Sequence, residues 1–222
     1  MDLRKLHNLS KKDFIQEVTK DGNVVLDVGC GCGGDFLKWG HNNVVVIACD
    51  PNERSVCEAK IRRAKVKIPI DVYLGDISCT PVNQYDIICY NFSLQYTFAS
   101  SELFKQTIKC IKDRSKIGTT LMGIVPDSDF IMMLPNHTVD SFGNEIHKEE
   151  LFGEFGESVN FYVPNTPYYK NGPLPEPVAW KDLLVTYLCK IGFELTLWTP
   201  LISYTTGTVS DVYSKFIFTR IK

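Results

Sequence analysis

The sequence predicts an α/β fold, with a seven-stranded, mostly parallel sheet, an antiparallel last strand and helices on both faces. Three observations lead to this prediction. Short apolar runs rich in β-branched and aromatic residues alternate with helix-like segments, as in βαβ units. Four glycines fall within six residues directly after the first run. Carboxylates stand at or near the ends of the first three runs, where parallel sheets bind their ligands.

Length and composition indicate one domain covering residues 1–222. The chain is 44% hydrophobic and 23% charged, which allows a full core. A net charge of −2 argues against sequence-independent binding of duplex nucleic acid. The eight cysteines are scattered singly, so we expect reduced thiols and no metal site. No apolar run reaches the ~18 residues of a membrane span. We therefore expect a cytoplasmic protein without a membrane partner, monomeric in isolation.

The predicted elements follow one another along the chain. A first amphipathic helix is expected over 10–20, with Ser10 as its cap and Phe14 and Ile15 on its buried face. Parallel strands are predicted at 24–29, 44–50, 70–76, 85–91 and 119–125. Helices are predicted near 35–41, 53–66, 101–114 and 179–191, and a closing strand pair at 194–198 and 214–221.

A long insertion interrupts this alternation. Residues 126–177 contain several prolines and many aromatic residues. Such proline-punctuated segments usually face a substrate, so we expect a substrate-facing insertion, with a disordered linker as the alternative.

The glycine turn indicates the kind of ligand. Glycines after a first strand let a ligand approach the backbone, as in dinucleotide sites where a helix start binds a pyrophosphate. Here Asp35 closes the turn formed by Gly29, Gly31, Gly33 and Gly34, and this acid would repel a phosphate. S-adenosylmethionine, which carries a sulfonium and an amino acid end, is the other common ligand of such a turn.

The acids fit that ligand. We expect Asp27 near the methionine amine, Asp50 at the ribose hydroxyls and Asp76 beside the adenine amino group. Each charge-assisted hydrogen bond of this type contributes about 1.5–3 kcal/mol. The alternative for each acid taken singly is a helix cap or a turn residue. Together they predict a Rossmann-like class I methyltransferase with S-adenosylmethionine as its cofactor.

Four separate stretches resemble the messenger RNA cap guanine-N7 methyltransferase family. LDVGCGCGGDFLKW at 26–39 is similar to the family's LDLGCGKGGDL followed by KW or KY. HNLSKKDFI at 7–15 is similar to its NNxIKxxLI, YNFSLQYTFAS at 90–100 to its QFSFHYxF, and LPEPVAW at 174–180 to its PEYLV. The resemblance spans nearly the whole chain. Its nearest parallel is among large cytoplasmic DNA viruses, in which this domain ends a multifunctional capping enzyme.

The resemblance implies roles for particular residues. Lys11 would hold the cofactor's carboxylate, and Gln95 and Glu176 would contact the guanine. The implied cofactor-binding set is Lys11, Asp27, Gly29, Gly31, Asp50, Asp76, Asn91 and Tyr96. The implied cap-guanine set is Phe92, Gln95, Tyr96, Glu176 and Tyr213. Two residues depart from the family pattern: Cys32 replaces a lysine, and Gln95 replaces a histidine.

The implied reaction is methyl transfer from S-adenosylmethionine to guanine N7 of the 5′ GpppN cap of mRNA. Guanine N7 is already unprotonated at neutral pH, so an in-line displacement needs positioning and no general base. The implied partners are 5′-capped RNA and other capping domains of the same polypeptide. Two alternatives stay open: a class I methyltransferase acting on another RNA position or a small molecule, and a catalytically inactive partner subunit.

Overall fold

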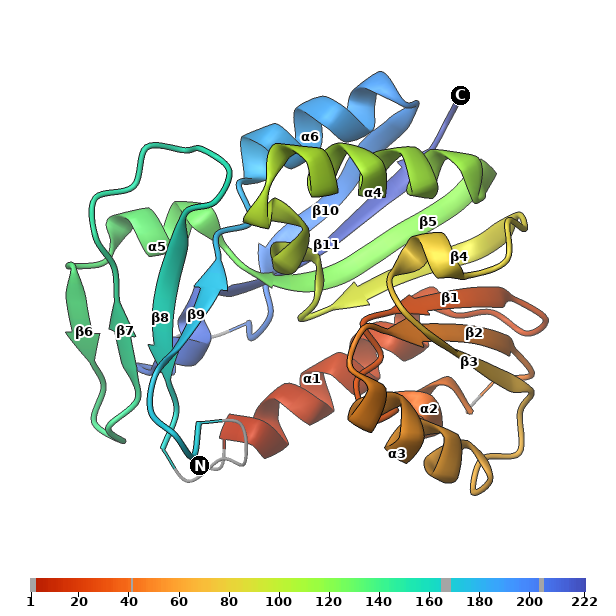
Figure 1. Cartoon of the computed structure of the whole chain (residues 1–222), viewed down its shortest axis with the longest axis horizontal. Coiled ribbons are helices and arrows are strands. Elements are labelled where there is room, and N and C mark those ends of the chain that lie inside the picture. Colours follow the sequence, from red (N-terminus) through yellow and green to blue (C-terminus); the bar gives the residue numbers. More distant parts are fainter. Residues whose placement is uncertain (1–2, 41, 165–168, 204–205) are drawn as a thin grey trace.

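The computed structural model describes residues 3–40, 42–164, 169–203 and 206–222. A seven-stranded sheet in the order β10-β11-β5-β4-β1-β2-β3 forms its centre (Figure 1). Its strands are β1 (Val24–Val28), β2 (Val45–Asp50), β3 (Ile70–Leu74), β4 (Tyr85–Asn91), β5 (Ser115–Pro126), β10 (Phe193–Pro200) and β11 (Tyr213–Arg220). The first five pair in parallel, and β11 runs antiparallel to both of its neighbours. The predicted α/β sheet is confirmed.

Helices cover both faces of this sheet (Figure 1). On one side lie α1 (Leu3–Val18), α2 (Phe36–Trp39) and α3 (Glu53–Arg63), and on the other α4 (Ser101–Asp113) and α6 (Lys181–Lys190). In α4, Ser100 caps the helix by accepting a hydrogen bond from the Leu103 amide. Phe104, Ile108 and Ile111 then recur at helical spacing and are buried against the sheet.

The first helix differs from the prediction. It begins at Leu3 and ends at Val18, so the predicted cap at Ser10 is wrong and this serine lies inside the helix. No glycine or proline interrupts residues 3–9, and these residues continue the helix that Phe14 and Ile15 anchor in the core. The predicted helix at 35–41 is likewise only four residues long, with Gly40 as its C-cap.

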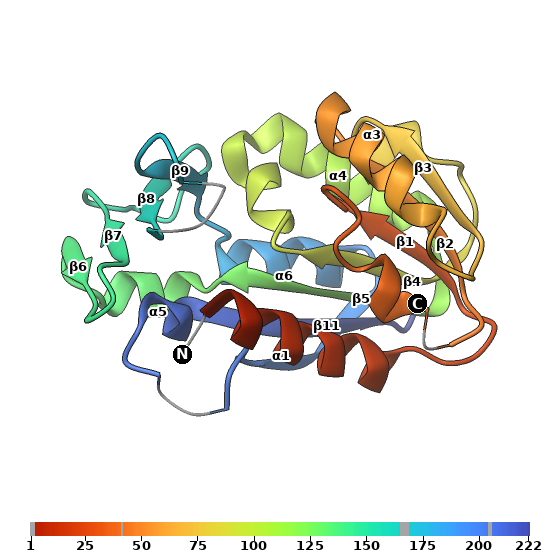
Figure 2. The same ribbon diagram turned by 90° about the horizontal axis from the view of Figure 1, so that it is seen from below.

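The insertion forms a second, smaller sheet. After α5 (Ser128–Met133), the strands β6 (His137–Val139), β7 (Glu145–His147), β8 (Ser158–Tyr162) and β9 (Leu174–Pro177) pair antiparallel in chain order. This insertion sheet stands beyond the carboxyl ends of the parallel strands (Figure 2). Ile146, Val159 and Phe161 are buried on its inner face. The disordered-linker alternative is therefore wrong for the described part of the insertion.

Asp127, at the end of β5, anchors the insertion to the main sheet. It is buried and accepts hydrogen bonds from Trp198 Nε1 at 2.7 Å and Ser214 Oγ at 2.5 Å. It also caps α5 through the Asp129 amide and forms a parallel bridge with Ala179. Through its side chain and its backbone, Asp127 thus joins β10, β11 and both ends of the insertion. None of the helices described here is long and apolar enough to cross a bilayer.

Candidate cofactor and substrate site

Three glycines of the turn after β1 adopt positive φ, and each has a different neighbourhood. A Cβ on Gly29 would lie 2.3 Å from Ser93 Cβ, and one on Gly33 would lie 2.5 Å from the Phe36 ring. A Cβ on Gly31, where φ is +52°, would meet no atom within 4 Å. Gly29 and Gly33 therefore serve packing. At Gly31 the backbone is open to the approach of a ligand.

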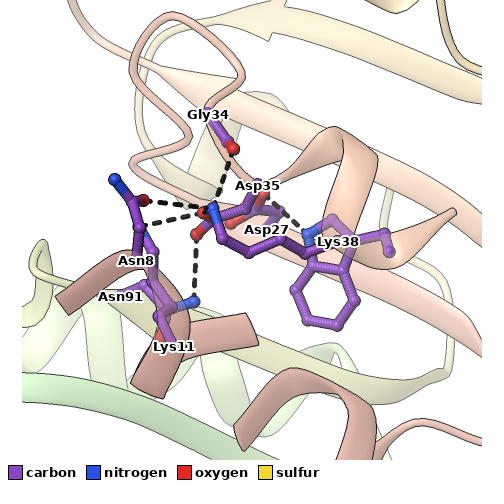
Figure 3. Close-up of polar contacts among 8 residues, drawn as sticks. Asn8, Lys11, Asp27, Gly34, Asp35, Lys38 and Asn91 are labelled. Atoms are coloured by element: carbon purple, nitrogen blue, oxygen red, sulfur yellow. Dashed lines mark hydrogen bonds and ion pairs between the residues drawn. The ribbon is translucent and has the colours of Figure 1, made fainter. Parts of the chain in front are cut away.

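Asp35 is the centre of an ion-pair cluster beside this turn (Figure 3). Its Oδ1 lies 2.9 Å from Lys11 Nζ and 2.8 Å from Lys38 Nζ. Its Oδ2 accepts a hydrogen bond of 3.1 Å from Asn91 Nδ2. Burial alone would raise the pKa of Asp35, but the two ammonium groups outweigh burial and hold it below its usual value. Asp35 thereby connects α1, the turn, α2 and β4.

Asp27 lies next to this cluster in a drier environment. Its side chain is buried near the carboxyl end of β1 and accepts a hydrogen bond of 3.1 Å from Trp39 Nε1. Burial, followed by the nearby negative charge of Asp35, raises its pKa to about 7. A carboxyl group in this state is suited to bind a cation, because the arriving positive charge favours its ionised form.

Asp50 and Asp76 stand at neighbouring strand ends and also hold the local backbone. Asp50 accepts the Gly31 amide at 2.8 Å and the Asn52 amide at 2.9 Å, one on each oxygen. Asp76 accepts the Ser78 amide at 2.8 Å and begins a short 3-10 helix. The alternative of caps and turn residues thus describes their local bonds. Each carboxylate keeps lone pairs for further donors, so these bonds leave the predicted ligand contacts possible.

Asn91, at the end of β4, contributes a buried acceptor. Its Oδ1 has no hydrogen-bond partner among the described residues, although its Nδ2 donates to Asp35. Buried polar atoms are nearly always hydrogen-bonded, so this unpaired acceptor is suited to accept a hydrogen bond from a bound ligand.

Phe92, which follows Asn91, belongs to a group of aromatic rings. Phe92 has φ of 58°, a conformation that bulky residues rarely adopt. Its ring lies 5.3 Å from that of Tyr213, edge to face, and 5.8 Å from that of His7, stacked. Tyr213 in turn stacks on Phe161 of the insertion sheet at 6.2 Å. Burial, with Lys11 second, lowers the pKa of His7 to about 4, so its ring is uncharged at neutral pH.

Gln95 and Glu176 meet across 81 positions of sequence. Gln95 Nε2 donates to Glu176 Oε2 at 3.2 Å, and the Tyr169 hydroxyl donates to Glu176 Oε1 at 3.2 Å. Burial raises the pKa of Glu176, and these two hydrogen bonds counteract the rise. Tyr96 is half exposed, and its pKa is raised to about 12 by burial and by the charges of Glu176 and Asp50. Tyr96 therefore lies near enough to Glu176 of the insertion and to Asp50 at the end of β2 for both charges to affect its pKa.

Contacts link the two predicted sets: Lys11 Nζ lies 5.4 Å from the centroid of the Phe92 ring, and Gln95 bonds to Glu176. Sequence reasoning missed four participants, namely His7, Asp35 as an ion-pair centre, Phe161 and Tyr169. His7 lies four positions before Lys11, hence on the same face of α1, and this spacing was the available signal. Tyr169 carried no such signal. The described residues contain no group of three His, Cys, Asp or Glu side chains placed to hold a metal ion.

The sheet order and the glycine turn define a class I S-adenosylmethionine-dependent methyltransferase fold. A methyltransferase of this kind from Clostridium acetobutylicum is similar over 98% of this chain and 92% of its own, with a TM-score of 0.68 and 14% identity. A putative one from Listeria monocytogenes is similar over 97% of this chain and 98% of its own, with a TM-score of 0.64 and 16% identity. These similarities show the fold.

The family follows from the sequence comparisons. A family model described as the mRNA (guanine-N(7))-methyltransferase domain matches residues 1–169, and the chain belongs to this family. An mRNA cap guanine-N(7) methyltransferase of Saccharomyces cerevisiae is 30% identical over 76% of this chain and 41% of its own length. One of Eremothecium gossypii is 28% identical over 96% of this chain and 56% of its own length. The chain thus spans about half the length of these curated relatives.

Proposed function

We propose that this chain transfers the methyl group of S-adenosylmethionine to guanine N7 of the 5′ GpppN cap of mRNA. One observation carries the proposal: Gln95 Nε2 donates to both Glu176 and the Phe92 carbonyl, and the Phe92 ring lies 5.4 Å from Lys11 Nζ, which pairs with Asp35 beside the glycine turn. A guanine-recognising group and a cofactor-binding group are thereby within reach of one another. Membership of the cap methyltransferase family supports the same conclusion.

The residues present fit S-adenosylmethionine, the cofactor that the fold and the family imply. The open backbone at Gly31 admits a ligand, and the orphan Asn91 Oδ1 lacks a donor. Asp27 would hold the ammonium, Asp50 the ribose and Asp76 the adenine amino group, while Lys11 would contact the carboxylate. When bound, the cofactor supplies an electrophilic methyl group on a sulfonium.

The guanine would be held by its edge and its face. Glu176 would accept hydrogen bonds from guanine N1–H and the N2 amino group, which also favours the electron-rich ring. Phe92 and Tyr213 would stack against the base, at roughly 1–3 kcal/mol per stacked base. Tyr96 would border both ligands. No residue of this set needs to remove a proton, so the work of the chain is to hold N7 in line with the methyl carbon.

The two departures from the family pattern alter the cap side of the crevice. Gln95 can donate and accept hydrogen bonds but carries no charge, and its Nε2 is already engaged by Glu176. Cys32 is half-buried in the glycine turn and adds no positive charge there. We therefore infer that cap phosphate binding relies on other cations.

The test is a labelled methyl-transfer assay on RNA with a GpppA cap, with uncapped and already methylated RNA as negative substrates. Glu176→Ala should abolish transfer at subsaturating cap. It should leave S-adenosylhomocysteine binding, measured by calorimetry, within about twofold, because Glu176 touches only the guanine half. Full activity in Glu176→Ala would refute the cap-pocket assignment, and absence of cofactor binding in the unaltered chain would refute the whole proposal. Phe152→Ala, an exposed aromatic outside the crevice, is the matched control.

We also infer the biological setting. The sequence resemblance to the capping enzymes of large cytoplasmic DNA viruses, with that of African swine fever virus nearest, would place the chain in host cytoplasm or a viral factory. There it would act as one domain beside other capping domains of the same polypeptide. An antibody against the chain, used on infected cells, would test both the location and the size of the polypeptide.

A further inference from the structure

The insertion sheet has a second, exposed face that the proposed function does not use. A hollow of about 430 Å³ lies on it, here called the outer concavity. It is lined by His137, Glu145, His147, Asn160, Tyr162 and Pro173. These side chains come from β6, β7, β8 and the residue before β9. Because side chains alternate along a strand, Phe161 of β8 and Glu176 of β9 lie on the opposite face of the insertion sheet. There Phe161 stacks on Tyr213 and Glu176 bonds to Gln95.

Strand register places the polar groups of the outer concavity side by side. His137 pairs with His147, and His147 pairs with Asn160, so the three form one row across β6, β7 and β8. The two imidazole rings lie 6.0 Å apart and nearly perpendicular. Glu145 pairs with Tyr162 in the next row, and its Oε2 lies 3.4 Å from His137 Nε2. The hollow thus offers flat rings next to an amide and a carboxylate.

This lining selects one chemistry of ligand. The lining side chains include no Lys or Arg and do include the carboxylate of Glu145, which disfavours a phosphate group inside the hollow itself. Tyr162 and Pro173 alone give too little apolar surface for an amphipathic helix. A nucleobase satisfies the remaining groups. It is flat and uncharged, it stacks on tyrosine and histidine rings, and its edge bonds to amides and carboxylates.

A pair of tyrosines links the outer concavity to the proposed cap site. The Tyr162 ring lies 6.4 Å from the Tyr169 ring, perpendicular to it. The Tyr169 hydroxyl donates to Glu176, the residue proposed to hold the guanine. We propose that the outer concavity binds a base of the single-stranded RNA that follows the cap. This inference rests on the proposed function, since it is the cap that would bring the RNA to this edge of the sheet.

The test compares RNA with the cap alone. Fluorescence anisotropy measures the affinity of the chain, with S-adenosylhomocysteine present, for a labelled RNA of about ten nucleotides with a GpppA cap and for its uncapped form. The GpppA dinucleotide is measured by competition. His147→Ala and Tyr162→Ala should each weaken binding of both RNAs by about 5- to 150-fold, the loss of one stacked base. Both should leave the GpppA dinucleotide affinity within about twofold. Tyr162→Phe keeps the ring and should restore RNA binding.

Controls separate this inference from its premises. Phe142→Ala alters an exposed aromatic residue between β6 and β7, outside the outer concavity, and should change none of the affinities. Unchanged RNA affinity in both His147→Ala and Tyr162→Ala would overturn the inference. An equal loss for the dinucleotide would overturn it too, because that result marks a general disturbance of the insertion. A further outcome separates the two proposals. If the unaltered chain transfers no methyl group, yet binds uncapped RNA more tightly than these two variants do, the proposed function fails and this site stands.

Discussion

Replacing Asp35 with asparagine removes the charge that holds two lysines beside the glycine turn. Lys11 Nζ and Lys38 Nζ lie 2.9 and 2.8 Å from Asp35 Oδ1, and all three side chains are at most 15% exposed. At an effective dielectric near 20, each pair interacts by about 6 kcal/mol. Desolvation offsets much of this, and removing one partner of such a pair typically costs about 3–5 kcal/mol. We expect Asp35→Asn to lower the free energy of unfolding by that amount.

The assay is urea denaturation followed by tryptophan fluorescence, since Trp39 packs beside the cluster. Asp129→Asn is the matched control. Its partner Lys181 lies at the same 2.8 Å, but that pair is 28% and 52% exposed, and exposed pairs contribute about 0–1 kcal/mol. A loss below about 1 kcal/mol for Asp35→Asn, equal to that of the control, would refute the argument that burial makes this cluster strong.

The pH dependence of stability provides a second readout of the same substitution. The pKa of Asp35 is lower in the folded chain than its usual value of 3.8. Its contribution is therefore present above pH 3.8 and is lost as pH falls through the folded pKa. Asp35→Asn should remove this part of the acid sensitivity. An acid transition identical to that of the unaltered chain would contradict the predicted direction.

Three further predictions concern other parts of the molecule. The pKa of Asp27 is about 7, so S-adenosylhomocysteine affinity measured by calorimetry should fall up to about tenfold per pH unit below 7, and Asp27→Asn should flatten that dependence. Gly29→Ala should lower the melting temperature more than Gly31→Ala, because both residues have positive φ but only the Cβ at Gly29 also collides, at 2.3 Å from Ser93 Cβ, whereas Gly31→Ala should in addition lose cofactor affinity; equal melting temperatures would contradict this. Trp198→Phe removes a donor from buried Asp127 and should cost about 1–3 kcal/mol in urea denaturation, a cost that an unchanged midpoint would disprove.

The main sheet could be predicted from sequence because its signals are local. Each parallel strand is rich in β-branched or aromatic residues, and β1 passes directly into a run of glycines, of which Gly29, Gly31 and Gly33 adopt positive φ. The insertion sheet could not be predicted in this way. The strands His137–Val139 and Glu145–His147 have three residues each, too few for a sequence pattern to identify them.

The site was predicted in its components but not in its connections. Asp27, Asp50 and Asp76 are recognisable because strand ends carry them to one edge. The bond between Gln95 and Glu176 joins residues 81 positions apart, and Asp35 collects partners from three separate elements. Such contacts depend on how helices pack on the sheet, which local patterns do not encode. Asp35 was accordingly interpreted as repelling phosphate, while its ion pairs remained undetected.

The two parts of the proposed site are completed at different times during synthesis, because the side-chain partners of Asp127 lie at positions 198 and 214. The turn, its acids and Asn91 all precede residue 92, so the ribosome delivers them first. The insertion is fastened by Trp198 and Ser214, and Tyr213 closes the aromatic group, so the opposite half waits for the last strands to emerge. A nascent chain would thus contain the proposed cofactor-binding residues well before the proposed RNA-binding residues are in place.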